Sequence, residues 1–317
     1  MKKRIISVLL ATVFALSVIG CGTKDTKEQD AYRQYGITCM ESGKYEDAVK
    51  AFQNALGESI GHIGEKELDI CFYKAKAQAL DGKTKDALAT YNAIIKYNKD
   101  ARAYYLRGDL YMDMGEEKKG RADFESAVQQ GKKNYEIYIG IYESLSRHEK
   151  KDEGQKYLSA VMEIKGDKPE DELYKGRISY LLGENKDAIS YLEKAKEHKQ
   201  MLASYYLGLA YDANGDSDKA KKCIAEYIKS GVATSYDLYE LGMQEMQDGN
   251  YKNALTYFNS GLELEKVPNK QNLMKSAIAA YEYSGDFDSA KKMMKEYLKA
   301  YPDDEEAKHE NTFLETR

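Results

Sequence analysis

Apolar residues recur along this chain at intervals of three and four positions, and short polar segments with glycine separate the runs. In the first such region Tyr32, Tyr35 and Cys39 share one face, and Phe52 and Ala55 share another after a break. Spacings of three and four place side chains on one side of an α-helix. The pattern therefore predicts pairs of amphipathic helices joined by tight turns over almost the whole chain after residue 28.

A second regularity is a pair of small residues twelve positions apart. The pairs are Gly36 with Ala48, Ala75 with Ala87, Gly108 with Gly120, Gly176 with Ala188, Gly208 with Ala220 and Gly242 with Ala254, with Ile278 and Ala290 as a weaker member. A glycine that can end a helix in the left-handed conformation lies between most of these pairs. Small residues let two antiparallel helices approach closely. Each unit is thus predicted to be a helix, a tight turn and a second helix.

Eight units fit this pattern, and together they span residues 29–304. They begin near residues 29, 68, 101, 133, 169, 201, 235 and 271, and residues 305–317 remain for a short cap or tail. Two places depart from the pattern. The fourth unit has Gly140 and Gly154 fourteen positions apart and no turn glycine, which predicts longer helices. The linker Gly57 to Gly64 lengthens the first spacing, which predicts a first unit that is angled or loosely attached.

These residues resemble the tetratricopeptide repeat family. Its signature of an aromatic residue, glycine, alanine, an aromatic residue and alanine is met by Tyr32, Gly36, Ala48, Phe52 and Ala55, and again in the third unit. Pro302 stands at the closing proline place of the last unit. The resemblance implies an all-α, right-handed superhelical solenoid of about eight repeats whose concave face binds other proteins.

The start of the chain has the form of a targeting segment. Lys2, Lys3 and Arg4 precede an uncharged apolar run over residues 5–19, and the sequence Val-Ile-Gly before Cys21 resembles the lipobox of bacterial lipoprotein precursors. The resemblance implies that residues 1–20 are removed and that Cys21 carries lipid. Residues 21–28 are polar and predict a flexible tether. We therefore expect a lipid-anchored protein on the extracytoplasmic face of the cell membrane.

Charge and chemistry narrow the function. The formal charge is −5, or −8 once the three cations of the leader are lost. The chain has no stripe of basic residues of the kind that binds nucleic acid. The four histidines are scattered, and the acidic segment at residues 212–218 fails the calcium-loop pattern at Ser217 and Cys223. Cys39, Cys71 and Cys223 fall in apolar helical patterns and are predicted to be buried. We expect no enzyme, no cofactor and no metal.

The inner side of the solenoid remains as the candidate binding surface. Counting from each unit start, we expect it to include Arg33, Phe72, Arg102, Tyr105, Asp109, Arg177, Tyr180, Tyr205, Tyr236, Tyr239 and Met243. Tyrosine and arginine are enriched at protein interfaces. The leading hypothesis is a scaffold or adaptor for envelope or secreted proteins and peptides. The alternative is a lipoprotein that captures a ligand or peptide for a transporter or a cell-wall enzyme.

Overall fold

The protein is all-α. A computed structural model describes residues 24–59, 63–164, 166 and 168–316, and within these ranges it contains seventeen helices and no strand. The apolar leader and Cys21 lie outside the described residues. The first helix begins at Lys24, so the second half of the predicted tether is helical rather than flexible. Lys24, Lys27 and Glu28 there are good helix formers that extend the helix backwards from its packed part.

The first eight helices form four hairpins. They are α1 (Lys24–Glu41), α2 (Tyr45–Gly57), α3 (Glu65–Leu80), α4 (Thr84–Asn98), α5 (Ala101–Asp113), α6 (Glu117–Gln130), α7 (Tyr135–Arg147) and α8 (Lys151–Met162).

The remaining nine form four more hairpins and a closing helix. They are α9 (Pro169–Leu182), α10 (Asn185–Glu197), α11 (Leu202–Ala213), α12 (Ser217–Lys229), α13 (Ser235–Gln247), α14 (Tyr251–Leu262), α15 (Lys270–Ser284), α16 (Phe287–Ala300) and α17 (Glu305–Glu315). The first helix of each hairpin begins within five residues of the unit start expected from the sequence.

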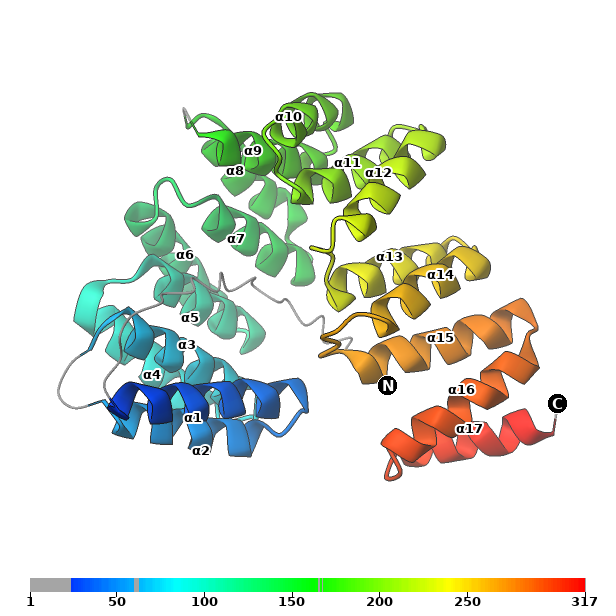
Figure 1. Cartoon of the computed structure of the whole chain (residues 1–317). Helices are drawn as coiled ribbons and strands as arrows, with labels where there is room; N and C mark the ends of the chain where they lie inside the picture. Colours follow the sequence, from blue (N-terminus) through cyan, green and yellow to red (C-terminus); the bar gives the residue numbers. More distant parts are fainter. Residues whose placement is uncertain (1–23, 60–62, 165, 167, 317) are drawn as a thin grey trace.

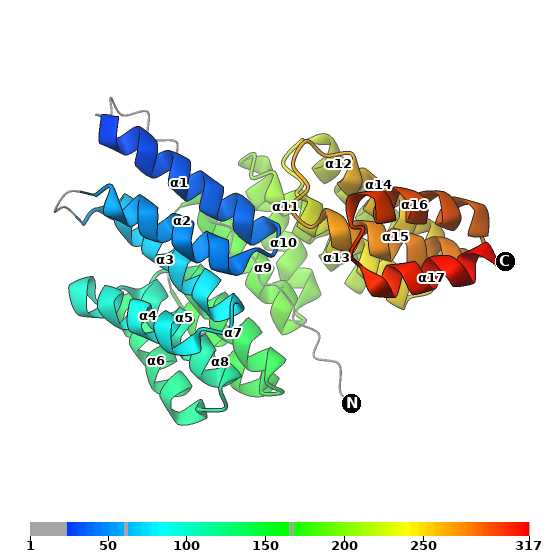
Figure 2. The same ribbon diagram turned by 90° about the horizontal axis from the view of Figure 1, so that it is seen from below.

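The hairpins stack side by side into a curved two-layer solenoid (Figures 1 and 2). First helices of successive hairpins pack against one another, as α1 does with α3, α5 with α7, α9 with α11 and α13 with α15. The first helices therefore lie on the inside of the curve and the second helices on the outside. The predicted all-α solenoid of helical hairpins is confirmed.

Within a hairpin, the small residue of the first helix lies against a large residue of the second. A Cβ atom added at Gly36 would come within 2.6 Å of the Phe52 ring, and one at Gly242 within 2.3 Å of the Phe258 ring. Phe52 and Phe258 are fully buried. Glycine at these places lets the aromatic ring of the partner helix fill the space where a side chain would otherwise stand.

The turns within the hairpins use glycine in the left-handed conformation. Gly249 has φ 75°, and the next residue, Asn250, donates its backbone N–H to the Glu245 carbonyl at 2.8 Å. This hydrogen bond closes α13 and turns the chain directly into α14. A side chain at Gly249 would be strained by the backbone conformation itself.

The fourth hairpin corrects the sequence interpretation. Its helices have 13 and 12 residues, so the predicted longer helices are wrong. The turn uses Glu149, which takes φ 62° in place of a glycine. Gly154 lies against Tyr142, twelve positions earlier, with 3.0 Å between its added Cβ and the Tyr142 Cα. Gly140 instead accommodates the ring of Tyr105 from α5.

The first hairpin is firmly joined to the second. Cys39 and Phe52 share a core with Ile70 of α3. The Glu67 carboxylate accepts hydrogen bonds from the Gln29 side chain at 2.9 Å and from the Gly64 backbone N–H at 2.8 Å. Burial alone would raise the pKa of Glu67, but these donors outweigh it and lower the pKa to about 2. A loosely attached first unit is therefore not what the structure shows.

The short closing helix α17 covers the last hairpin. Ala307 and Leu314 are buried in one core with Tyr297 of α16. Asp304 caps α17, because its carboxylate accepts from the Ala307 backbone N–H at 3.1 Å and also lies 2.6 Å from Lys275 Nζ. Across the described part of the chain, no helix is both long enough and apolar enough to cross a bilayer.

The close contact in the seventh hairpin yields a stability prediction. We expect Gly242→Ala to lower the free energy of unfolding by about 1 to 3 kcal/mol, because the new methyl group would collide with the buried Phe258 ring. The matched control is Gly57→Ala, since a Cβ at Gly57 would meet nothing within 4 Å. That variant should be unchanged or slightly more stable. Urea unfolding followed by circular dichroism measures both, and equal effects would contradict the packing argument.

Candidate binding surface on the inner face

The inner face, formed by the first helices of the hairpins, has a charged half from α1 to α9. Three ion pairs each join one first helix to the next. They are Arg33 with Asp69 at 2.6 Å, Asp109 with Arg147 at 2.5 Å and Glu143 with Arg177 at 3.1 Å. All six side chains are between 22% and 28% exposed. Removing one partner of a pair this far withdrawn from water is costly, because the other charge is then left unpaired.

Arginine stacking on aromatic rings fills the gaps between these pairs. The Arg102 guanidinium of α5 lies 3.5 Å from the centroid of the Phe72 ring of α3. Arg177 of α9 also lies over the Tyr206 ring of α11, at 5.4 Å. Such cation–π contacts are attractive because the ring face is negative. Every junction between first helices from α1 to α11 therefore has a polar or cation–π contact across it.

The inner face changes character from α11 onward and becomes aromatic and sulfur-rich. Tyr205 packs edge-on against Tyr206 with ring centroids 5.1 Å apart, and Tyr239 lies on Phe258 at 6.2 Å. Met243 accepts a weak hydrogen bond from Ser276 of α15 at 3.6 Å. Tyr236, Tyr239 and Met243 all remain half-buried. This half offers apolar contact area beside the acidic side chains of Asp237 and Glu240.

The two ends of the inner face approach each other around the curve. Burial raises the pKa of Tyr236 in α13, and the nearby Glu41 and Tyr45 add to this effect. Glu41 ends α1 and Tyr45 begins α2, about 190 positions earlier in the sequence. The beginning of α13 therefore lies near the first hairpin, which partly encloses the inner face (Figure 2).

Comparison with known protein families agrees with this architecture. Models described as tetratricopeptide repeat match residues 36–95 and 74–135, and residues 202–230 and 271–304. Together these matches cover about half of the chain. The chain belongs to the tetratricopeptide repeat family.

Several solved structures share the hairpin architecture at low sequence identity. A tetratricopeptide repeat protein from Parabacteroides merdae is 12% identical, with a TM-score of 0.47 over 80% of this chain and 99% of that one. PilW, a type IV pilus biogenesis factor, is 17% identical, with a TM-score of 0.44 over 66% of this chain and 97% of that one. No curated protein sequence matches this chain significantly. These similarities carry no conclusion about function.

Within this tetratricopeptide repeat solenoid, the predicted inner-face residues are not equally accessible. Phe72 is 6% exposed and belongs to a core with Tyr91 and Ala103, so its side chain is withdrawn from the surface. Tyr105 fills the space beside Gly140, and Tyr180 packs on the core of the fifth and sixth hairpins. Arg102, Tyr236, Tyr239 and Met243 keep part of their surface. The ion-pairing residues Arg33, Asp109 and Arg177 are already engaged within the protein.

The sequence interpretation missed the partners of those charges. Asp69, Glu143 and Arg147 complete the three ion pairs but were not among the predicted inner-face residues. Their places in the repeat, on the same sides of the first helices as the predicted residues, were a usable signal. Glu143 and Arg147 both belong to α7, a helix from which no inner-face residue was predicted.

One cluster on the rim of the inner face brings together metal-ligating side chains. Asp109, Asp113 and His148 offer ligand atoms within 4.8 Å of one another, although His148 lies 35 positions after Asp113. Burial raises the pKa of Asp113, and Arg147 and His148 oppose that effect. Arg147 binds Asp109, and His148 Nε2 lies 3.2 Å from Asp113 Oδ1. Both carboxylates of the cluster are thus already in contact with groups of the protein itself.

The ion pair between α7 and α9 gives a testable prediction. Arg177→Met removes the cation beside Glu143, whose pKa is already raised by burial. We expect the free energy of unfolding to fall by about 1 to 3 kcal/mol near pH 7.5. The loss should shrink near pH 5, because the raised pKa lets the unpaired carboxyl take up a proton in the folded state.

The control is the double variant Arg177→Met with Glu143→Gln, which removes the unpaired charge and should recover part of the stability. Thermal unfolding at the two pH values measures all three proteins. If the single variant loses the same stability at both pH values, the loss comes from packing of the arginine stem rather than from an unpaired Glu143.

Proposed function

We propose that this protein is a membrane-anchored lipoprotein that serves as a scaffold or adaptor, and that its inner face binds envelope or secreted proteins. Tetratricopeptide repeat proteins generally mediate interactions between proteins, which supports the general part of the proposal. The observation that carries the choice of surface is the run of half-buried aromatic and sulfur side chains on α11 and α13, at Tyr205, Tyr236, Tyr239 and Met243. Residues of these types are enriched where proteins meet.

The charged half of the inner face can orient a bound segment of a partner protein. Among the described residues, Arg102 contacts a ring but no carboxylate, and Lys76 of α3 has no ion-pair partner. Burial without a counter-charge lowers the pKa of Lys76. An acidic group of a partner would satisfy both cations, whereas the aromatic half would accept apolar side chains. We therefore infer a partner segment with acidic and apolar parts.

The lipid anchor at Cys21 is proposed from the sequence alone. Cys21 lies three residues before α1 begins, so a lipid on its thiol would hold the first hairpin within about 10 Å of its attachment point. More than one acyl chain gives stable anchoring. Partners would then be membrane-proximal or secreted proteins. The proposal assigns the protein no catalytic role.

The inner face is tested by crosslinking and purification of partners from native membranes. In the test variant, Arg102→Ala, Tyr236→Ala and Met243→Ala remove accessible inner-face groups and leave the buried packing residues intact. The matched control is Tyr35→Ala with Met201→Ala, two side chains that are 57% and 45% exposed elsewhere. We expect the wild type and the control to recover the same envelope proteins, and the test variant to recover them at least tenfold less.

Recovery of the same proteins by all three forms would show that the inner face does not bind them. If no form recovers a protein partner and a small ligand copurifies instead, the ligand-capturing alternative replaces the scaffold. Circular dichroism of each variant confirms that lost binding does not reflect lost folding.

The anchor is tested by Cys21→Ser expressed in a bacterium. We expect the wild type to partition into the detergent phase of a Triton X-114 extract and its N-terminal peptide to carry diacylglycerol by mass spectrometry. The variant lacks the thiol that accepts the lipid, so it should lose the diacylglycerol. An unmodified Cys21 in the wild type would rule out the lipoprotein assignment.

A further inference from the structure

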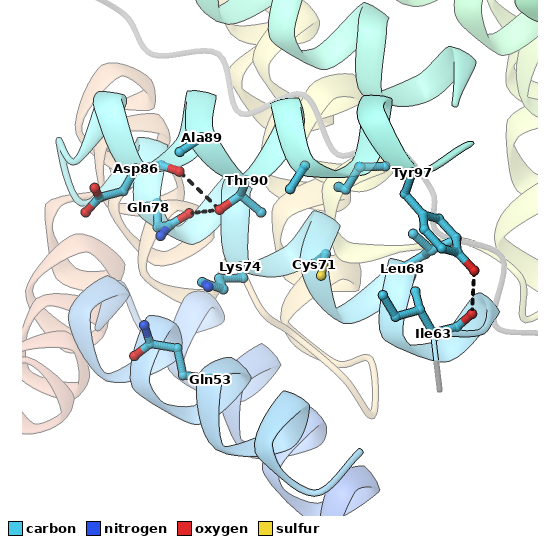
Figure 3. Close-up of a pocket in the computed structure, with 12 residues that line it drawn as sticks. Gln53, Ile63, Leu68, Cys71, Lys74, Gln78, Asp86, Ala89, Thr90 and Tyr97 are labelled. Carbon is cyan, nitrogen blue, oxygen red and sulfur yellow. Dashed lines mark hydrogen bonds between the residues drawn. The ribbon is translucent and has the colours of Figure 1, made fainter. Parts of the chain in front are cut away.

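A groove of about 520 Å³ opens on the outer side of the solenoid between the first and second hairpins (Figure 3). Its floor is α3, one wall is α4, and Gln53 of α2 stands on the other side. It lies at the junction where the long linker separates the first two units by 39 positions. There α2 and α4 do not close over α3, so this side of α3 faces the groove.

The two ends of the groove differ in chemistry. Ile63, Leu68 and Tyr97 form an apolar end, where the Tyr97 hydroxyl donates to the Ile63 carbonyl at 3.0 Å. Lys74, Gln78 and the acidic side chain of Asp86 lie toward the other end, and Cys71 lies between the two ends (Figure 3). Leu68 and Lys74 are six residues apart on one helix, or about 9 Å along the groove.

The polar end has hydrogen-bond donors that the described residues leave unused. Gln78 is only 5% exposed, and its Oε1 accepts from the Thr90 hydroxyl at 2.8 Å. No described residue accepts a hydrogen bond from its Nε2, and none forms an ion pair with Lys74. The Gln78 amide N–H and the Lys74 ammonium can therefore donate to an acceptor on a molecule in the groove.

We propose that this groove is a second binding site, on the face opposite the inner face, for a short peptide segment of a partner protein. An aliphatic side chain of the segment occupies the apolar end between Leu68 and Tyr97. A carboxylate two residues further along pairs with Lys74, and a backbone carbonyl accepts from Gln78. Two residues of extended chain span about 7 Å, and the reach of a glutamate side chain covers the rest.

The shape of the groove favours a peptide over a lipid chain. Ile63 and Tyr97 on its rim are 50% and 55% exposed, so one side of any occupant stays in water. A peptide tolerates this, because its other side chains and its backbone are polar. An acyl chain would leave much of its length hydrated and would gain little from the transfer.

Cys71 provides a reporter within the groove. The sequence predicted a buried residue, but Cys71 is half-buried because the groove opens over it, whereas Cys39 and Cys223 are 3% and 7% exposed. Burial raises the pKa of the Cys71 thiol, and Lys74 partly opposes this. Alkylation near pH 8.5 therefore reports access to the groove, with Cys39 and Cys223 as internal references.

The experiment measures the rate of Cys71 alkylation by N-ethylmaleimide in the full chain, followed by mass spectrometry of the peptide that contains Cys71. The probe is acetyl-Ser-Leu-Ser-Glu-Ser-amide, and the matched probe has Gln in place of Glu. We expect the Glu probe to slow alkylation at least threefold with saturation, and the Gln probe to do so clearly less. For each variant the rate with probe is divided by the rate without it, since Lys74 also affects the thiol.

Lys74→Gln should make the two probes equivalent. Lys85→Gln, which neutralises an exposed lysine of α4 outside the groove, should leave the difference between them unchanged. Absence of protection by the Glu probe up to 10 mM, or a Glu preference that survives Lys74→Gln, would overturn the proposal. Stronger protection by decanoate than by either peptide would identify a lipid site and would also overturn it.

This site stands apart from the inner face, and the same measurement separates the two. The inner-face variant with changes at Arg102, Tyr236 and Met243 should keep full protection of Cys71 by the Glu probe. Loss of partner proteins from that variant with intact protection would leave the groove site standing. Normal partner recovery without any protection would remove the groove site alone.

Discussion

The close approach of two helices within each hairpin is the contact on which the rest of the structure depends. A small residue in the first helix lies against a large buried residue of the second, as Gly36 does with Phe52 and Gly242 with Phe258. This contact brings the helices near enough to share one apolar layer but leaves that layer open on both sides. Neighbouring hairpins close it, and the cores accordingly span consecutive units, as between α1 and α3. A stack whose units depend on their neighbours is the result.

Stacking also determines what the inner face can do. From α1 to α9 most of its charged side chains form ion pairs between successive helices. These side chains therefore stabilise the stack and are not free to bind a partner. The cations without a counter-charge, Arg102 and Lys76, then stand out among the paired charges of α1 to α9. The later helices contribute aromatic and sulfur side chains instead. A partner would thus be oriented by charge at one end and held by apolar contact at the other.

The second surface lies at the junction of the first two hairpins. There α3 is uncovered between α2 and α4, so that Cys71, Lys74 and Gln78 line a groove. Because α1 starts three residues after Cys21, a lipid there would hold the start of the first hairpin close to the bilayer. The protein would then offer one site at the first junction and a larger one within the curve of the solenoid.

The sequence by itself determined the helices, most of the hairpin frames and the family, because these depend on periodicity within about forty residues. The spacing of Gly208 and Ala220, for example, fixes which sides of two adjacent helices meet. It also marked Cys21 as the candidate lipid site, to which the described residues add nothing.

Only the tertiary structure decided which inner-face residues are accessible and where the repeat departs from its rule. In the sequence Gly140 belonged to the small pair of the fourth unit, but in the structure it contacts Tyr105 of another hairpin. Phe72 was expected on the inner face but is buried in a core. The ion-pair partners, the cluster around His148 and the groove beside Cys71 likewise join residues from different helices. Periodicity records which side of one helix is apolar, whereas burial and charge pairing depend on the angle and distance at which the next hairpin packs.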